Sequence, residues 1–140
     1  MATTTATISV SSNILSYPIS INNSMTMKRA GSCHGLEETS GLNTKKITST
    51  TAFKLFGNAE ATAGGASKVY IRNSGASTTD FFYVGYGEDL AAATVETIGR
   101  LYGGNWMLIP WDAVAATTHD IYAKSSTAEP MHIEYMAFTE

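Results

Sequence analysis

Charged side chains are scarce in this chain. Asp, Glu, Lys and Arg make up 15% of its 140 residues, whereas hydrophobic residues make up 44%. An average soluble domain is about 25% charged, and disordered chains combine high charge with low hydrophobicity. The composition therefore predicts a folded domain, of a length typical of one domain. Its surface has few charges to oppose association, which favours a protein that packs against others.

Several other features are missing, and each excludes a class of protein. The one cysteine, Cys33, cannot form an internal disulfide framework. No apolar run approaches the roughly 20 residues of a membrane-spanning helix, and the N-terminus lacks the basic and apolar regions of a secretory signal. The net charge of −3 gives no support to nucleic-acid binding. We expect a soluble protein that is not exported by the general pathway, with no membrane and no nucleic acid among its partners.

Signatures of catalysis and metal binding are also missing. The nucleophile motif G-x-S-x-G does not occur, and His34, His119 and His132 stand in unrelated contexts. The stretch from Cys33 to Glu38 holds four possible metal ligands, but zinc sites draw paired ligands from two separate places. We interpret this stretch as a polar loop. We expect no catalytic residues, no metal site and no cofactor, and hence no enzyme.

Alternation of apolar and polar residues predicts about eight short strands separated by turn signals, the pattern of a sandwich or barrel. The segments are Ser24–Arg29, Ile47–Phe56, Lys68–Arg72, Asp80–Tyr86, Thr97–Tyr102, Asn105–Pro110, Asp120–Lys124 and Met131–Phe138. Gly103-Gly104 suits a tight hairpin turn, and Glu88–Val95 is the only helix candidate. We predict an all-β fold, an antiparallel β-sandwich that is jelly-roll-like.

The first 27 residues contain no charged side chain and are rich in Thr, Ser, Asn and Ile. Such a segment suits extended chain that pairs with a sheet edge or lies across a neighbour. We predict an extended N-terminal arm or edge strands over residues 1–29, a loop over 30–46 and the sandwich body over 47–140. Whether the arm packs within or between subunits stays open. Its candidate interface residues are Ile8, Val10, Ile14, Leu15, Ile19 and Ile21.

Aromatic side chains supply one more interface candidate. Proline ends strands, so the Pro110-Trp111-Asp112 corner predicts a bend with Trp111 on the rim, where a tryptophan is a good interface anchor. Core packing explains most of the other rings, because alternation points some of them inward. The alternative is a sugar-binding face with Trp106 or Trp111 as the stacking platform.

The block from Lys68 to Glu140 resembles small virion structural proteins of tailed bacteriophages. The matching pieces, in chain order, are VYIRNSG (69–75), FYVGYG (82–87), IGRLYGGNWMLIP (98–110) and IEY (133–135). The pattern covers about half the chain and carries no catalytic signature. The first half adds no recognisable motif.

The resemblance implies a structural protein of the virion, assembled in the host cytoplasm. The leading hypothesis is a capsid decoration (cement) protein that binds the assembled shell and stabilises it. Its partners would be other copies of itself, with a trimer favoured, and the major capsid protein. A tail component such as a tube, terminator or baseplate-proximal subunit, bound to tail proteins, is the first alternative. A carbohydrate-binding β-sandwich module is the alternative from another class.

Overall fold

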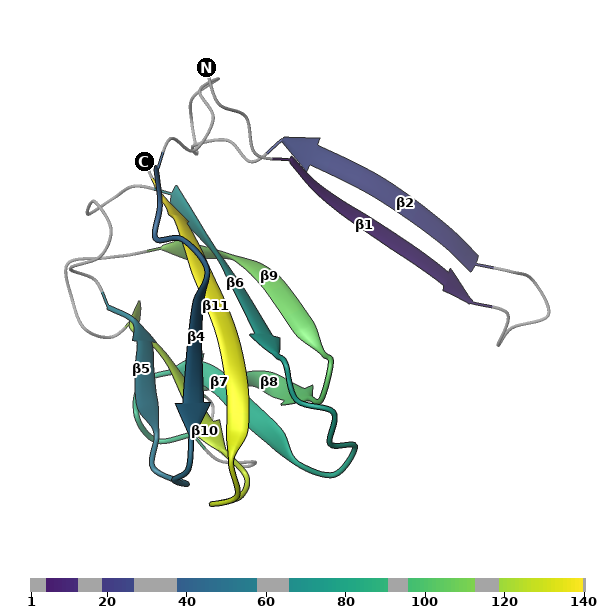
Figure 1. Cartoon of the computed structure of the whole chain (residues 1–140). Helices are drawn as coiled ribbons and strands as arrows, with labels where there is room; N and C mark the ends of the chain where they lie inside the picture. The colour runs from purple at the N-terminus through teal and green to yellow at the C-terminus, as the bar shows by residue number, and fades with distance from the viewer. Residues whose placement is uncertain are drawn as a thin grey trace.

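The computed structural model describes residues 5–12, 19–26, 38–57, 66–90, 96–112 and 119–139. These residues form antiparallel strands in two packed sheets and a separate two-stranded hairpin (Figure 1). The prediction of an all-β sandwich is confirmed. Within the described ranges, no helix is long and apolar enough to span a membrane.

The two sheets of the sandwich are called sheet I and sheet II. Sheet I contains β3 (Glu38–Thr39), β4 (Asn43–Ile47), β11 (Met131–Thr139), β6 (Ala66–Asn73) and β9 (Trp106–Asp112). Sheet II contains β5 (Phe53–Phe56), β10 (Ile121–Ser125), β7 (Phe81–Tyr86) and β8 (Thr97–Tyr102). The order is β3–β11–β6–β9 in sheet I, with β4 also paired to β11, and β5–β10–β7–β8 in sheet II.

The strand pairs nest inside one another along the chain. β4 pairs with β11, β5 with β10, β6 with β9 and β7 with β8, all antiparallel. Successive pairs lie alternately in sheet I and sheet II. The first strand of the body is therefore held by the last, and most contacts of the fold join residues far apart in the sequence.

The core lies between the sheets, where alternate side chains of each strand point inward. Val69 and Ile71 of β6 are fully buried, and so is Ile133 of β11. An aromatic group fills one end of the core. The Phe56 ring lies 5.7 Å from the Trp111 ring and 5.5 Å from the Tyr135 ring.

The predicted loop over residues 30–46 is wrong in its second part, because β3 and β4 lie there and pair with β11. The body therefore begins by Glu38 and not at residue 47. Of the five residues of β4 only Ile47 is buried. A polar edge strand shows no apolar alternation, so its sequence reads as a loop. Of the helix candidate, residues 88–90 are not helical, and 91–95 lie outside the described residues.

The prediction of a hairpin at Gly103-Gly104 is also wrong. A tight turn does form there, with the Asn105 N–H donating to the Tyr102 carbonyl at 2.9 Å. Gly104 has φ of 80°, which suits the third position of a type II turn. However, β8 pairs with β7 and β9 pairs with β6, so the turn carries the chain from sheet II to sheet I.

Asn73 fastens this crossing to the end of β6. Its side chain is fully buried, donates to the Leu101 carbonyl at 2.9 Å and accepts from the Gly75 N–H at 3.0 Å. Its backbone carbonyl also accepts from the Gly104 N–H at 2.9 Å. One side chain therefore satisfies a backbone carbonyl of sheet II and a backbone N–H just beyond the end of β6.

Gly103 is predicted to be required for space. A Cβ added at Gly103 would lie 2.5 Å from the Ser77 carbonyl oxygen, whereas a Cβ added at Gly99, on the adjoining strand β8, would meet nothing within 4 Å. We expect Gly103→Ala to lower the free energy of unfolding by about 1–3 kcal/mol. Gly99→Ala, the matched control, should change it by less than about 1 kcal/mol. Urea denaturation of both variants measures the difference, and equal stability would contradict the packing described.

Candidate functional site

The N-terminal segment forms a β-hairpin of its own. β1 (Thr5–Ser12) and β2 (Ile19–Thr26) pair antiparallel over their full length. Within the described residues the hairpin joins neither sheet I nor sheet II. Figure 1 shows it, in purple, beside the sandwich and apart from both sheets. An isolated two-stranded hairpin is marginally stable in water at best. The hairpin thus lacks the support that the body strands give one another.

The hairpin has one apolar and one polar face. Directly paired residues of an antiparallel ladder point to the same side. The register places Ala6, Ile8, Val10 and Ser12 on one side with their partners Met25, Asn23, Ile21 and Ile19. The other side carries only Thr, Ser and Asn: Thr5, Thr7, Ser9, Ser11, Ser20, Asn22, Ser24 and Thr26. Here the Thr7 and Ser24 hydroxyls lie 3.1 Å apart.

The apolar face of the hairpin is open to solvent. Ile8 is 40% exposed, Val10 47% and Ile21 46%. Exposed apolar side chains that lie together mark interaction sites more often than scattered ones do. Since no hairpin residue is charged, covering this face would not require an ion to be desolvated. The hairpin therefore presents an uncharged apolar surface that a contact can cover without desolvating an ion.

Sheet I presents a second open surface on the side that faces away from sheet II. Trp106, at the start of β9, is 51% exposed, and its ring lies 6.5 Å from that of Tyr70 at an angle of 34°. Together with Arg72 and Gly104 these rings line a shallow, open hollow of about 470 Å³. The Arg72 guanidinium lies 3.4 Å from a Glu134 carboxylate oxygen. We call this surface the Trp106 face.

The expected exposed position of Trp111 is wrong. Trp111 is 1% exposed and belongs to the core, where its indole N–H donates to the His119 carbonyl at 2.7 Å. It presents no surface to a partner or to a sugar. Strand β9 continues through Pro110, because it is an edge strand of the described sheet and edge strands tolerate proline.

The other predicted site residues divide into two groups. The structure brings Ile8, Val10 and Ile21 together on the apolar face of the hairpin. Ile19 has its place in the same register, although its side chain lies outside the described residues. Four further residues of interest also lie outside them: Ile14, Leu15, Cys33 and His34.

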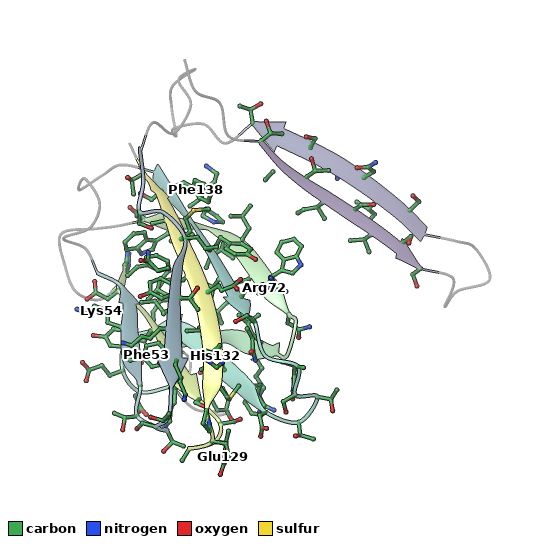
Figure 2. The ribbon with its side chains drawn as sticks, in the orientation of Figure 1. Phe53, Lys54, Arg72, Glu129, His132 and Phe138 are labelled. Carbon is green, nitrogen blue, oxygen red and sulfur yellow. The ribbon has the colours of Figure 1, made fainter. Side chains whose placement is uncertain are left out.

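An ion pair between an exposed lysine and a buried carboxylate lies on the other side of the molecule. The Lys54 ammonium is 2.6 Å from a carboxylate oxygen of Asp120, whose side chain is fully buried. Figure 2 shows Lys54 and Arg72 on opposite sides of the sandwich. Lys54 also lies over the Tyr122 ring, 5.6 Å from its centroid, and the Tyr122 hydroxyl donates to Glu88 at 3.2 Å. These contacts join β5, β10 and the turn after β7.

In this cluster the pKa values of both Lys54 and Tyr122 are raised, so both groups keep their protons more firmly than usual. The hydrogen bond to Asp120 raises the pKa of Lys54 above its ordinary value of 10.5, although burial acts in the opposite direction. Burial raises the pKa of Tyr122 above 10.0, and the bond to Glu88 adds to this, whereas Lys54 opposes it. A lysine held protonated cannot serve as a nucleophile or a base near neutral pH. The cluster therefore has the chemistry of a structural clamp.

Metal ligands do not converge in the described part of the chain. Within it, no three His, Cys, Asp or Glu side chains lie close enough together to hold an ion.

We expect alkaline pH to loosen the clamp. Lys54 and Tyr122 both have a raised pKa in the folded protein, so the unfolded chain releases these protons first. Their contribution is fully present below about pH 10 and is lost as the pH rises through the folded values. Thermal melting between pH 8 and pH 12 should show this fall, and Tyr122→Phe should make it shallower. An unchanged slope in the variant would contradict the role of Tyr122.

No protein-family model, no curated protein and no solved structure matches the chain. Function is therefore inferred from the two open surfaces that the described residues present, the apolar face of the hairpin and the Trp106 face.

Proposed function

We propose that this chain is a structural assembly protein that attaches to its partner through the β1–β2 hairpin. The observation that carries the proposal is the exposed apolar face of the hairpin, with Ile8, Val10 and Ile21 all between 40% and 47% exposed. A polar opposite face and a complete lack of charge fit an element that is covered on one side and wet on the other. The sandwich body would hold this attachment element in place.

The topology of the body supports a virion role. We take the sandwich for a jelly roll, because the strand orders β4–β11–β6–β9 and β5–β10–β7–β8 arise from four nested antiparallel pairs in two sheets. Jelly rolls are common in viral capsid domains and in lectins. Fold alone does not decide between these two uses. The hairpin favours the first, since a sugar-binding module has no need of an uncharged apolar arm.

The specific role that we propose is capsid decoration in a tailed bacteriophage. The resemblance to small virion proteins of these phages falls on β6, β7, the β8–β9 crossing and β11. Its RNSG piece contains Asn73, which fastens that crossing. The partners would be the major capsid protein and other copies of this chain, with a trimer favoured. A tail component would use the same hairpin on tail proteins and is the alternative location.

Attachment would work by mass action. A protein that binds only the assembled shell lowers the free energy of the shell by the energy of binding. Ile8, Val10 and Ile21 are 40–47% exposed, so covering the rest would contribute about half of the roughly 1.5–3 kcal/mol that full burial of such a side chain gives. Ordering the interface takes part of this energy. Each copy would then add a modest stabilisation, repeated over many copies in the shell.

A second candidate function is carbohydrate binding at the Trp106 face. The exposed Trp106 ring, the tilted Tyr70 ring and the polar groups of Arg72 and Glu134 are of the types that bind sugars. Soluble oligosaccharides, such as chitohexaose and cellohexaose, should then change the fluorescence of Trp106. A response to them in the micromolar to millimolar range, lost in Trp106→Ala, would favour this function over assembly.

The hairpin proposal predicts that charge on one face abolishes attachment and charge on the other does not. We expect the double variant Ile8→Asp, Val10→Asp to be missing from phage particles grown with it, because two carboxylates would have to be buried. The matched control Ser9→Asp, Ser11→Asp carries the same charges on the polar face of the same strand. It should remain at the copy number of the unmodified protein.

Quantitative mass spectrometry of purified particles measures the copy number, and circular dichroism confirms that both variants fold. Equal occupancy by both variants would contradict attachment through the apolar face. Absence of the unmodified chain from the particles would contradict the virion role itself.

A further inference from the structure

We propose that the apolar face of the hairpin docks on the Trp106 face of a second copy of this chain. Aliphatic side chains of the hairpin would enter the hollow between Tyr70, Arg72 and Trp106. This inference rests on the proposed function and narrows it: of the partners named there, another copy of this chain would bind the apolar face of the hairpin, so that the arms link neighbouring copies on the shell. It joins the apolar face of the hairpin and the Trp106 face in one contact.

The Trp106 face has the apolar chemistry that such a hairpin needs. Across three adjacent strands of sheet I, Tyr70 is paired with Met136 on β11 and with Leu108 on β9. All three side chains are half-buried, and the Tyr70 ring lies beside the exposed Trp106 ring. Trp, Tyr and Arg are the residues most enriched at the energetic centres of protein interfaces. The hollow that they form here is open at the side, which suits an inserted segment of chain.

Charge favours the hairpin as the occupant. All 21 charged residues of the chain lie beyond residue 27, and together they give a net charge of −3. Two copies of the chain, each with a net negative charge, repel each other weakly when they approach. A contact made by the uncharged hairpin adds no further repulsion. On the receptor side, Arg72 already has Glu134 as its ion-pair partner, so docking would cover a pair and not an isolated charge.

The hairpin is suited to lie on the face of sheet I and not along its edge. Adding a strand to the edge at β9 would leave the apolar face of the hairpin exposed to water. Pro110 also lacks an N–H and weakens β9 as a template for pairing. Packing face to face, about 10 Å from sheet I, buries the apolar face and leaves the Ser, Thr and Asn face in water.

The dimensions indicate that the contact is made more than once in each assembly. Two strands of eight residues cover roughly 10 by 24 Å, so one docked hairpin would remove roughly 500 Å² from water, counted over both surfaces. Stable interfaces bury about 1,200–2,000 Å². Two reciprocal contacts in a dimer would remove roughly 1,000 Å², just below this range, so either a dimer or a closed ring needs additional contacts between the bodies to reach it. Because donor and receptor surfaces differ, both arrangements are allowed.

Light scattering after size exclusion of the purified full chain tests the proposal. The unmodified protein should form a dimer or a closed ring. Ile8→Asp on the donor surface and Trp106→Asp on the receptor surface should each weaken self-association by about a hundredfold or more. Two controls should leave it unchanged: Ser9→Asp on the polar face of the hairpin, and Ile98→Asp at an exposed apolar position of sheet II.

Mixing the two defective variants identifies the partners. The Ile8→Asp protein keeps its receptor and the Trp106→Asp protein keeps its hairpin, so the mixture regains one intact contact. At high concentration the two should associate one-to-one, more weakly than the unmodified protein but more strongly than either variant does alone. A hairpin-to-hairpin interface would leave Trp106→Asp fully associated. An interface between two Trp106 faces would leave Ile8→Asp fully associated. Either result, or a mixture that at the same high concentration associates no more than each variant does alone, would overturn the proposal.

Tryptophan fluorescence gives a second, independent measurement. The chain has two tryptophans, and only Trp106 is exposed to a quencher such as iodide. Quenching should be weak in the associated protein and strong in Ile8→Asp. A monomer in which Trp106 is protected would mean that the hairpin docks within its own chain, which overturns the proposal. A monomer with quenchable Trp106 that still occupies particles would overturn it too, while the proposed function would stand.

Discussion

The hydrogen bonds of Asn73 are the constraint on which the sandwich depends. They lie where the chain leaves sheet II after Tyr102 and enters sheet I at Trp106. At this corner, backbone groups cannot pair within a ladder, and buried groups without partners are costly. The Asn73 amide satisfies a carbonyl and an N–H at once, so the chain can turn tightly. The pairing of β6 with β9, and with it the Trp106 face, follows from that turn.

Much of the body could be predicted from sequence because alternation is local. In β6 every second described residue is buried, and the same holds in β11 except at the half-buried Tyr135. Val69, Ile71 and Ile133 point inward as expected. Strand partners are not local. The sequence around Gly103 indicates a turn but carries no information on whether its flanking strands pair with each other. Strands β3 and β4 were missed because they are short and polar, and their order comes from hydrogen bonds with β11, which lies far along the chain.

The candidate site was predicted in part. Composition alone indicated that the N-terminal segment differs from the body, because its 27 residues are uncharged and charged residues occur throughout the rest. Which tryptophan is exposed could not be deduced. Trp106 and Trp111 lie on the same strand an odd number of residues apart, so alternation puts them on opposite faces without saying which face is buried. The packing of Phe56 and Tyr135 against Trp111 decides it, and those residues are distant in sequence.

The uncharged hairpin has a consequence for the conditions under which an attached protein would stay attached. Salt screens ion pairs, but the uncharged hairpin forms no ion pair with the surface that covers it, so salt has nothing to screen there. Apolar contacts weaken on cooling, because exposing apolar groups to water costs less free energy at low temperature. Attachment through Ile8, Val10 and Ile21 would therefore withstand concentrated brine and loosen near freezing. An assembly held by such arms would be released by cold sooner than by salt.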